Sequence, residues 1–207
     1  MSQRFFARAN PSFGRRNPPK RIFSRMKKAG RMSSKVNRWS LAIGYVAFIY
    51  ATLSYVRIPV NYLRSQGILS TSLLILFGIF FGSILIAFIR TQTKEVWRYI
   101  LFFTFLGVLI GAASYVQQPE EKIHFLQYAL VGIFFARALS LHSSTKWKIL
   151  LGSFVLGSLA GWFDEVIQGW LPNRHYDIRD IQFNVFSVLL GLSIYAVFPK
   201  KRGQNTP

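Results

Sequence analysis

The chain has 207 residues, 51% of them hydrophobic, and its 26 Lys and Arg residues against 7 Asp and Glu residues give a formal net charge of +19. The apolar content excludes a soluble disordered chain, and the absence of Cys excludes disulfide scaffolds, thiol nucleophiles and Cys-ligated zinc. The charge would suit a soluble nucleic-acid-binding protein, but the long apolar runs would not, so nucleic acid is not expected as a partner. The composition is typical of a polytopic membrane protein with a basic tail.

The chain begins with this basic tail, residues 1–38, which holds 12 Lys and Arg residues and no acidic residue. Apolar residues recur at helical spacing among the bases, at Ile22, Met26, Ala29 and Val36. The pattern predicts a short interfacial helix on anionic lipid headgroups, where each basic residue contributes roughly 1 kcal/mol. A solvated orientation signal, a docking segment for a protein partner and an organellar transit peptide are the alternatives.

Six apolar stretches follow the tail, and each is long enough to cross a bilayer core about 30 Å thick, which takes roughly 20 residues of helix. Backbone polar groups must be paired inside lipid, so we expect helices. The predicted fold class is all-α, a polytopic membrane bundle of six transmembrane helices with a basic cytoplasmic N-terminal tail. The expected spans are about 40–63, 68–89, 97–116, 123–141, 147–168 and 178–198.

The domain organisation and the orientation follow from these spans. After the tail come two additional transmembrane helices at 39–96, a four-helix transmembrane region at 97–198 and a C-terminal tail at 199–207. With this topology, 21 of the 26 Lys and Arg residues fall on the side of the termini, and the positive-inside rule places both termini in the cytoplasm. All acidic residues except Glu95 fall at the outer face, so any polar site is expected there.

The first polar group opens the fourth span. Glu120, Glu121 and Lys122 lie in or just before its first turn, where acidic residues complement the helix dipole. His124 and Tyr128 are four residues apart and share one helix face. His124 is either a packed hydrogen-bonding residue or a proton carrier.

The second polar group ends the fifth span, where Asp164, Glu165 and Gln168 lie near the outer hydrocarbon boundary. Ionisable residues at such depth are costly and are candidates for function. Glu165 continues a series of small residues spaced by four, which lets another helix approach closely. Glu165 is therefore expected to point into the bundle, and the series consists of Ser153, Gly157 and Gly161.

The third polar group joins the fifth and sixth spans. Asp177 is a natural N-cap of the sixth span, and Asp180, Asn184 and Gly191 follow on the same helix face. Arg174 in the connection could pair with Asp164, Glu165 or Asp177. One interpretation is an ion-pair clamp between the two spans, which would mainly confer specificity because desolvation offsets much of the attraction.

The second and third groups resemble the signature of the VanZ-like membrane proteins. The matching residues are Asp164-Glu165, Gln168, Pro172, Arg174, Asp177 or Asp180, Asn184 and Gly191. The family also has an upstream element, in which a Lys is followed by His-Phe and then by a Tyr. This chain matches the element with one residue fewer between the Lys and the His. The residue before the Lys is Glu here, where the family usually has Asp. This element consists of Glu121, Lys122, His124, Phe125 and Tyr128.

The resemblance covers residues 97–198 and leaves the tail and the first two spans outside. It implies a bacterial integral membrane protein of the cell envelope, in the cell inner membrane. It also implies a link to antibiotic resistance, because the family is named for a protein that gives low-level teicoplanin resistance. Most members have no established activity, and the fold alone cannot supply the chemistry.

Three functions remain open. The first is a binding, structural or accessory subunit of a membrane assembly, with the polar cluster as a clamp and protein partners docked on the extra spans and the tail. The second is an enzyme on an extracytoplasmic lipid or cell-envelope substrate, in which Glu165 or Asp164 is the base, His124 a second proton carrier and Arg174 an anion holder. The third is a transporter.

The sequence names no cofactor. A variant of the enzyme hypothesis places a metal on His124 with Asp164, Glu165 or Asp180, although these residues show no diagnostic spacing and no metal site is assigned. The expected partners are the bilayer itself and anionic lipid headgroups, the latter through residues 1–38.

Overall fold

The computed structural model describes residues 20–91, 95–115, 121–172 and 176–198. Glu120, Arg174, the start of the basic tail and the C-terminal tail lie outside these ranges. The described residues form helices and no strand, which confirms the predicted all-α bundle. The helices are α1 (Lys20–Thr52), α2 (Arg57–Ser65), α3 (Leu69–Arg90), α4 (Val96–Tyr115), α5 (Glu121–Leu139), α6 (Lys146–Trp170) and α7 (Ile178–Val197).

Four of these helices are long and apolar enough to cross a membrane, namely α3, most of α5, α6 and α7. The Val36–Thr52 part of α1 and the following α2 make a fifth span if this bent pair is counted as one. Helix α4 contributes a shorter apolar stretch, Val96–Val108. The protein is therefore a multi-pass membrane protein with four candidate spans, or up to five, in the ranges described, where the sequence predicted six.

The span predicted at 40–63 is not one continuous helix. Helix α1 ends at Thr52, α2 begins at Arg57, and the two are bent by 60°. Pro59 explains the break, because in a continuous helix its ring would clash with the carbonyl of Tyr55, whereas Pro is tolerated in the first turn of a new helix.

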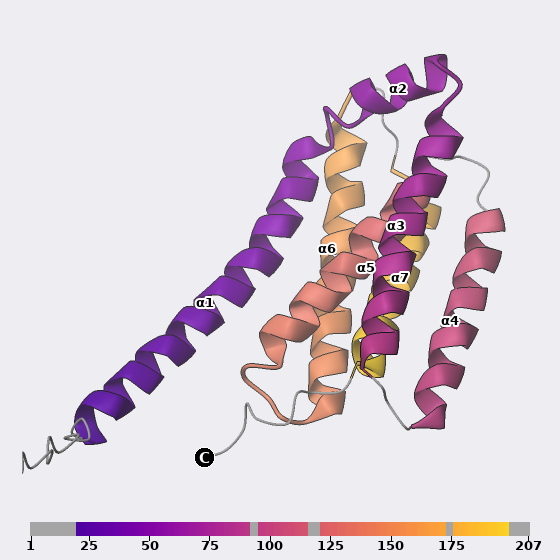
Figure 1. Ribbon diagram of the computed structural model, residues 1–207. Helices are drawn as coiled ribbons and strands as arrows, with labels where there is room; N and C mark the ends of the chain where they lie inside the picture. The colour runs from indigo at the N-terminus through magenta and orange to yellow at the C-terminus, as the bar shows by residue number, and fades with distance from the viewer. Residues whose placement is uncertain (1–19, 92–94, 116–120, 173–175, 199–207) are drawn as a thin grey trace, which may run out of the picture. The chain divides into compact units, whose positions relative to one another are not determined.

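A short turn joins α2 to α3 (Figure 1), and Gly67 lies in this turn. Its φ of 69° lies in the left-handed region, which Gly adopts at little cost. The N–H of Ile68 donates to the carbonyl of Leu63 at 3.0 Å. This is the hydrogen bond of a Schellman cap, which satisfies a carbonyl at the end of the helix.

Helix α1 begins at Lys20, so part of the basic tail belongs to the same helix as the apolar stretch. The sequence predicted a short interfacial helix there. Contacts divide the chain into two units, residues 1–34 and residues 35–207, and all the packing that follows lies within the second.

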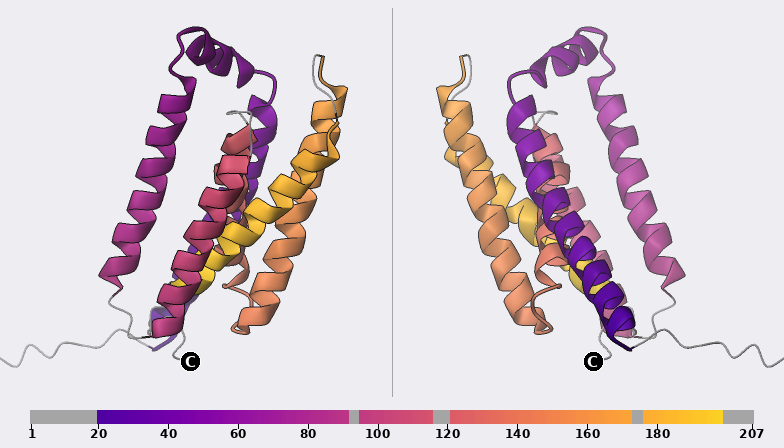
Figure 2. Two further views of the ribbon diagram at one scale, coloured as in Figure 1. Left: turned by 90° about the vertical axis from the view of Figure 1, so that its right-hand side faces the viewer. Right: turned by 90° about the vertical axis from the view of Figure 1, so that its left-hand side faces the viewer.

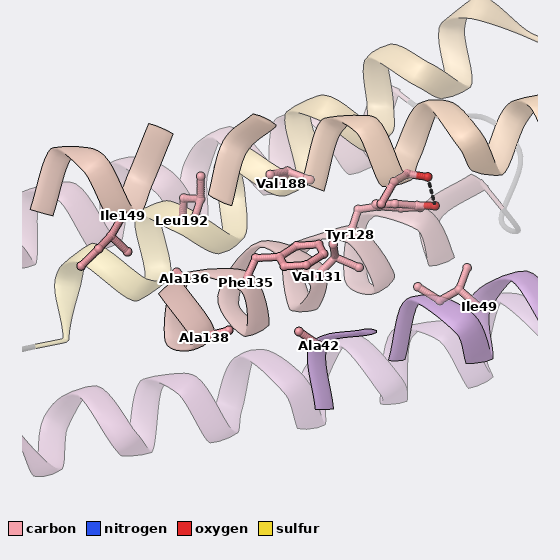
Figure 3. Close-up of a cluster of buried hydrophobic side chains, with 11 residues drawn as sticks. Ala42, Ile49, Tyr128, Val131, Phe135, Ala136, Ala138, Ile149, Val188 and Leu192 are labelled. Carbon is pink, nitrogen blue, oxygen red and sulfur yellow. Dashed lines mark hydrogen bonds between the residues drawn. The ribbon is translucent and has the colours of Figure 1, made fainter. Parts of the chain in front are cut away.

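Helices α5, α6 and α7 contact one another and form the centre of the second unit, with α4 packed on α7 and α2 on α3. Figure 2 shows α7 running obliquely, near α6 at the α2 end and near α4 at the other end. The main apolar core lies between these helices and α1 (Figure 3). It includes Tyr128 and Val131 of α5, Ile149 of α6, Val188 of α7 and Ile49 of α1.

The contact between α5 and α7 depends on two glycines. A Cβ on Gly132 would lie 2.7 Å from the carbonyl oxygen of Val188, and a Cβ on Gly191 would lie 2.7 Å from the carbonyl carbon of Ala129. Real Cβ atoms are not found so close to backbone. The two helices therefore approach through their main chains, which only small residues permit.

Candidate functional site

The α6 carboxylates lie at the face that the small residues create. Ser153, Gly157 and Gly161 are buried, as the spacing by four predicted. A Cβ on Gly161 would lie 2.7 Å from Cβ of Asn184 and 3.4 Å from Cε1 of Tyr128. The glycine therefore brings side chains of α5 and α7 next to the last turns of α6.

Asp164 and Glu165 are fully buried, each with 0% of its surface exposed. Gln168, one turn further along α6, donates from Nε2 to Oδ2 of Asp164 at 3.2 Å and to Oε1 of Glu165 at 3.0 Å. The backbone N–H of Asp177 donates to Oε2 of Glu165 at 3.3 Å. These four residues, which we call the carboxylate clamp, tie the end of α6 to the start of α7.

His124 and Tyr128 of α5 lie beside the clamp. Nδ1 of His124 is 3.8 Å from Oδ2 of Asp164, and the rings of His124 and Tyr128 stack with centroids 6.3 Å apart, as their shared helix face predicted. The Tyr128 hydroxyl donates to the carbonyl of Ala160 at 3.5 Å, drawn as a dashed line in Figure 3. Asn184 of α7 donates from Nδ2 to the carbonyl of Gly161 at 3.2 Å.

The sequence analysis missed Tyr50 of α1. Its hydroxyl donates to the carbonyl of Ala160 at 2.7 Å, so two tyrosines from different helices share one α6 carbonyl. Nothing in the local pattern of the first span distinguishes Tyr50, because its partner lies 110 residues away in the sequence.

Asp177 caps α7, as predicted. Its carboxylate accepts a hydrogen bond from the N–H of Arg179 at 2.8 Å and another from Nη2 of the same residue at 2.7 Å. The bond from the Arg179 side chain, together with that from its N–H, holds the pKa of Asp177 below its usual range. The carboxylate therefore stays charged at neutral pH and complements the dipole of the α7 N-terminus.

Removing this cap should destabilise the protein modestly. We expect Asp177→Ala to lower the free energy of unfolding by about 1 kcal/mol, and Asp177→Asn, which still caps, to retain most of it. Since the pKa is lowered on folding, the carboxylate stabilises the protein above its ordinary pKa, and this contribution disappears as the pH falls through the lowered value. The difference in melting temperature between wild type and Asp177→Ala in detergent should therefore become smaller at acidic pH, and a difference that does not change with pH would contradict this account.

The remaining predicted residues contribute less to the site. Glu121 begins α5, but its side chain is outside the described residues, as is Arg174, so the pairing predicted for Arg174 stays a prediction. Lys122 is half-buried and makes no hydrogen bond or ion pair with the described residues. Within those residues, no three His, Asp or Glu side chains come together to hold a metal ion.

A polar cavity of about 380 Å³ lies in front of His124. We call it the α2 pocket, because one wall is α2 with the end of α1, and the other is formed by α5 and α7. The clamp carboxylates do not line it. Its polar lining residues are Thr52, Arg57, Asn61, Arg64, His124, Gln127 and Asp180.

The α2 residues of this pocket were also missed, although a signal for two of them was present. Arg57 and Asn61 interrupt the apolar run that was taken as the first span, and Pro59 stands between them. Charged residues inside a membrane run mark functional positions, and Pro marks a helix boundary. Together these residues could have indicated a polar helix at the bundle end.

Comparison with protein-family models, with curated proteins and with solved structures finds no match.

Proposed function

We propose that this chain is a VanZ-like protein of the bacterial inner membrane that acts by binding, as an accessory subunit of a membrane assembly. The observation that carries the proposal is the complete burial of Asp164 and Glu165, whose oxygens accept hydrogen bonds from Gln168 and from the Asp177 backbone. Carboxylates engaged in this way hold helices together. Recognition is then left to the α2 pocket, which is polar and has a volume of about 380 Å³.

The proposed topology has six spans with both termini in the cytoplasm. The bent pair α1–α2 counts as one span and α4 as another, beside α3, α5, α6 and α7. The distribution of Lys and Arg supports this orientation, since 21 of the 26 then lie on the cytoplasmic side. The basic tail would lie on anionic headgroups of the cytoplasmic leaflet, and the α2 pocket would open at the outer face.

The chemistry of the α2 pocket suits a polar segment of a partner protein. Arg57, Asn61 and Arg64 lie on one face of α2, and all three are exposed. His124, Gln127 and Asp180 face them from α5 and α7. The lining combines donors and acceptors, so a partner loop with both kinds of group would be recognised by hydrogen bonds rather than by apolar area.

Filling the pocket tests the binding function. Asn61→Trp places an indole in the pocket from an exposed position on α2, whereas Ser65→Trp adds the same bulk at an exposed α2 position outside the lining. Extraction from the native membrane in mild detergent should give a complex of fixed stoichiometry by native mass spectrometry. We expect Asn61→Trp to lose the partner and Ser65→Trp to keep it, with unchanged melting temperatures. A wild-type protein that is a monomer, or equal loss in both variants, would contradict the proposal.

One observation favours an enzyme as the second candidate. His124 lines the α2 pocket and also lies 3.8 Å from the buried Asp164. A histidine that faces a cavity beside buried carboxylates can carry a proton, so Glu165 or Asp164 would be the base and His124 the second proton carrier. The two functions differ in what they predict for Glu165→Gln, because a clamp loses stability, whereas a catalytic base loses turnover and keeps the fold.

A further inference from the structure

A second and larger cavity lies at the other end of the bundle. It has a volume of about 660 Å³ and is bounded by five helices, α3 to α7. This volume is within the range of about 300–1,000 Å³ found for small-molecule sites. We call it the basal cavity, and its lining begins at the last turns of α3 and α5 and the first turns of α4 and α6.

The lining is apolar with a basic rim. Phe80 and Ile84 of α3 and Ile133 of α5 are among the many apolar residues, and the charged residues in it are Arg98, Arg137 and Lys146. No acidic residue lines the cavity. A site of this kind combines a surface for a hydrocarbon chain with a place for a negative charge.

The three cations differ in what already binds them. Arg98 is 6% exposed, and it donates from Nη1 to the carbonyl of Val197 at 2.6 Å and from Nε to Glu95 at 2.9 Å. The hydrogen bonds from Arg98 and Trp97 lower the pKa of Glu95, and the charges of Arg98 and Lys146 lower it further. Glu95 therefore offsets Arg98 by direct contact and Lys146 only at a longer distance. Arg137 and Lys146 are exposed, and their side chains make no hydrogen bond or ion pair with the described residues.

We propose that the basal cavity binds an anionic phospholipid, with the phosphate between Arg137 and Lys146 and an acyl chain against the apolar lining. The cavity lies between helices of membrane-spanning length, so hydrocarbon chains are the apolar ligand at hand. A soluble anion would leave the apolar lining unused, and a zwitterionic lipid would add a positive charge next to Arg137 and Lys146. This site is separate from the α2 pocket and does not depend on the proposed function.

The test compares charge variants of one helix. The full-length protein in mild detergent is titrated with phosphatidylglycerol, and the lipid-bound fraction is measured by native mass spectrometry. Each basic residue near an anionic headgroup contributes roughly 1 kcal/mol, so Lys146→Gln and Arg137→Gln should each weaken binding about fivefold. Lys148→Gln is the matched control, because Lys148 is also exposed on α6 but does not line the cavity; it should change binding less than twofold. Equal loss in Lys148→Gln would mean general surface attraction and would overturn the proposal.

Three further arms identify the ligand. Phosphatidylcholine should bind more weakly than phosphatidylglycerol, and equal binding would contradict the role of the cations. Ala87→Trp adds bulk to the α3 wall of the cavity without changing its charge, and it should reduce phosphatidylglycerol binding while the protein keeps its melting temperature. Inorganic phosphate should not displace the lipid at millimolar concentration. Displacement, or full binding to Ala87→Trp, would assign the basic rim to a soluble anion and reject the lipid.

Discussion

Gly191→Ala is expected to lower the free energy of unfolding by about 3 kcal/mol, the upper part of the usual range for overpacking. The added methyl would lie 2.7 Å from the carbonyl carbon of Ala129 and closer still to its oxygen. The obstacle is backbone, which cannot turn aside as a side chain can. Helices α5 and α7 would have to separate. Most of the buried apolar contacts at the centre of the bundle lie between α5, α6 and α7, so the separation would weaken them.

The matched control is Gly82→Ala in α3, where nothing lies within 4 Å of the added atom. Ala is favoured over Gly inside a helix by roughly 0.5–1 kcal/mol, so this variant should melt at the wild-type temperature or slightly above. Thermal unfolding in detergent, followed by circular dichroism, gives the comparison. Similar melting temperatures for Gly191→Ala and wild type would show that α5 and α7 do not meet through their main chains.

Glu165→Ala is the second large effect we expect, with a loss of about 3 kcal/mol in the free energy of unfolding, because it removes a buried acceptor of two hydrogen bonds and leaves a cavity. The donors are Nε2 of Gln168 and the N–H of Asp177. The half-buried N–H of Asp177 would then lose this acceptor, and Gln168 would keep only its hydrogen bond to Asp164. The joint between the end of α6 and the start of α7 would weaken, and the α2 pocket would lose the support behind His124.

Glu165→Gln separates a clamp from a catalytic base. An amide has one acceptor oxygen, so one of the two donors would face an NH₂ group, at a cost of about 1–3 kcal/mol. A clamp therefore predicts a lower melting temperature, intermediate between wild type and Glu165→Ala. The control is Glu95→Gln, which makes the same substitution at a side chain that is 52% exposed and should lower the melting temperature less than Glu165→Gln does. A Glu165→Gln protein that melts like wild type would reject the clamp and favour the enzyme.

The helices from α3 to α7 could be predicted from the sequence because each coincides with one long apolar run. The sequence also indicated the buried face of α6, since Ser153, Gly157 and Gly161 repeat every four residues, and the cap at Asp177, since capping is a local property. These features need only the geometry of a single helix. The ends of the helices α3 to α7 differ from the predicted bounds by two residues or fewer.

Features that depend on distant segments were not predictable in the same way. The hydroxyl of Tyr50 reaches Ala160 across 110 residues, and only the packing of α1 on α6 brings them together. The α2 pocket likewise arises because Pro59 breaks an apolar run and turns Arg57 and Asn61 toward α5. The local signals were present, but hydropathy averaged over a span outweighs one Pro and two polar residues.

The main-chain contact of α5 with α7 also determines which part of the protein can move. Helices that touch through their backbones have no layer of side chains between them that could slide or repack. The wall of the α2 pocket that carries His124 and Asp180 is therefore expected to stay fixed. The opposite wall, α2, is a nine-residue helix joined to α1 by a bend and to α3 by the turn at Gly67. Entry and release of any ligand should then proceed by a swing of α2 against a stationary α5–α7 pair, as hydrogen exchange faster in α2 than in α5 would show.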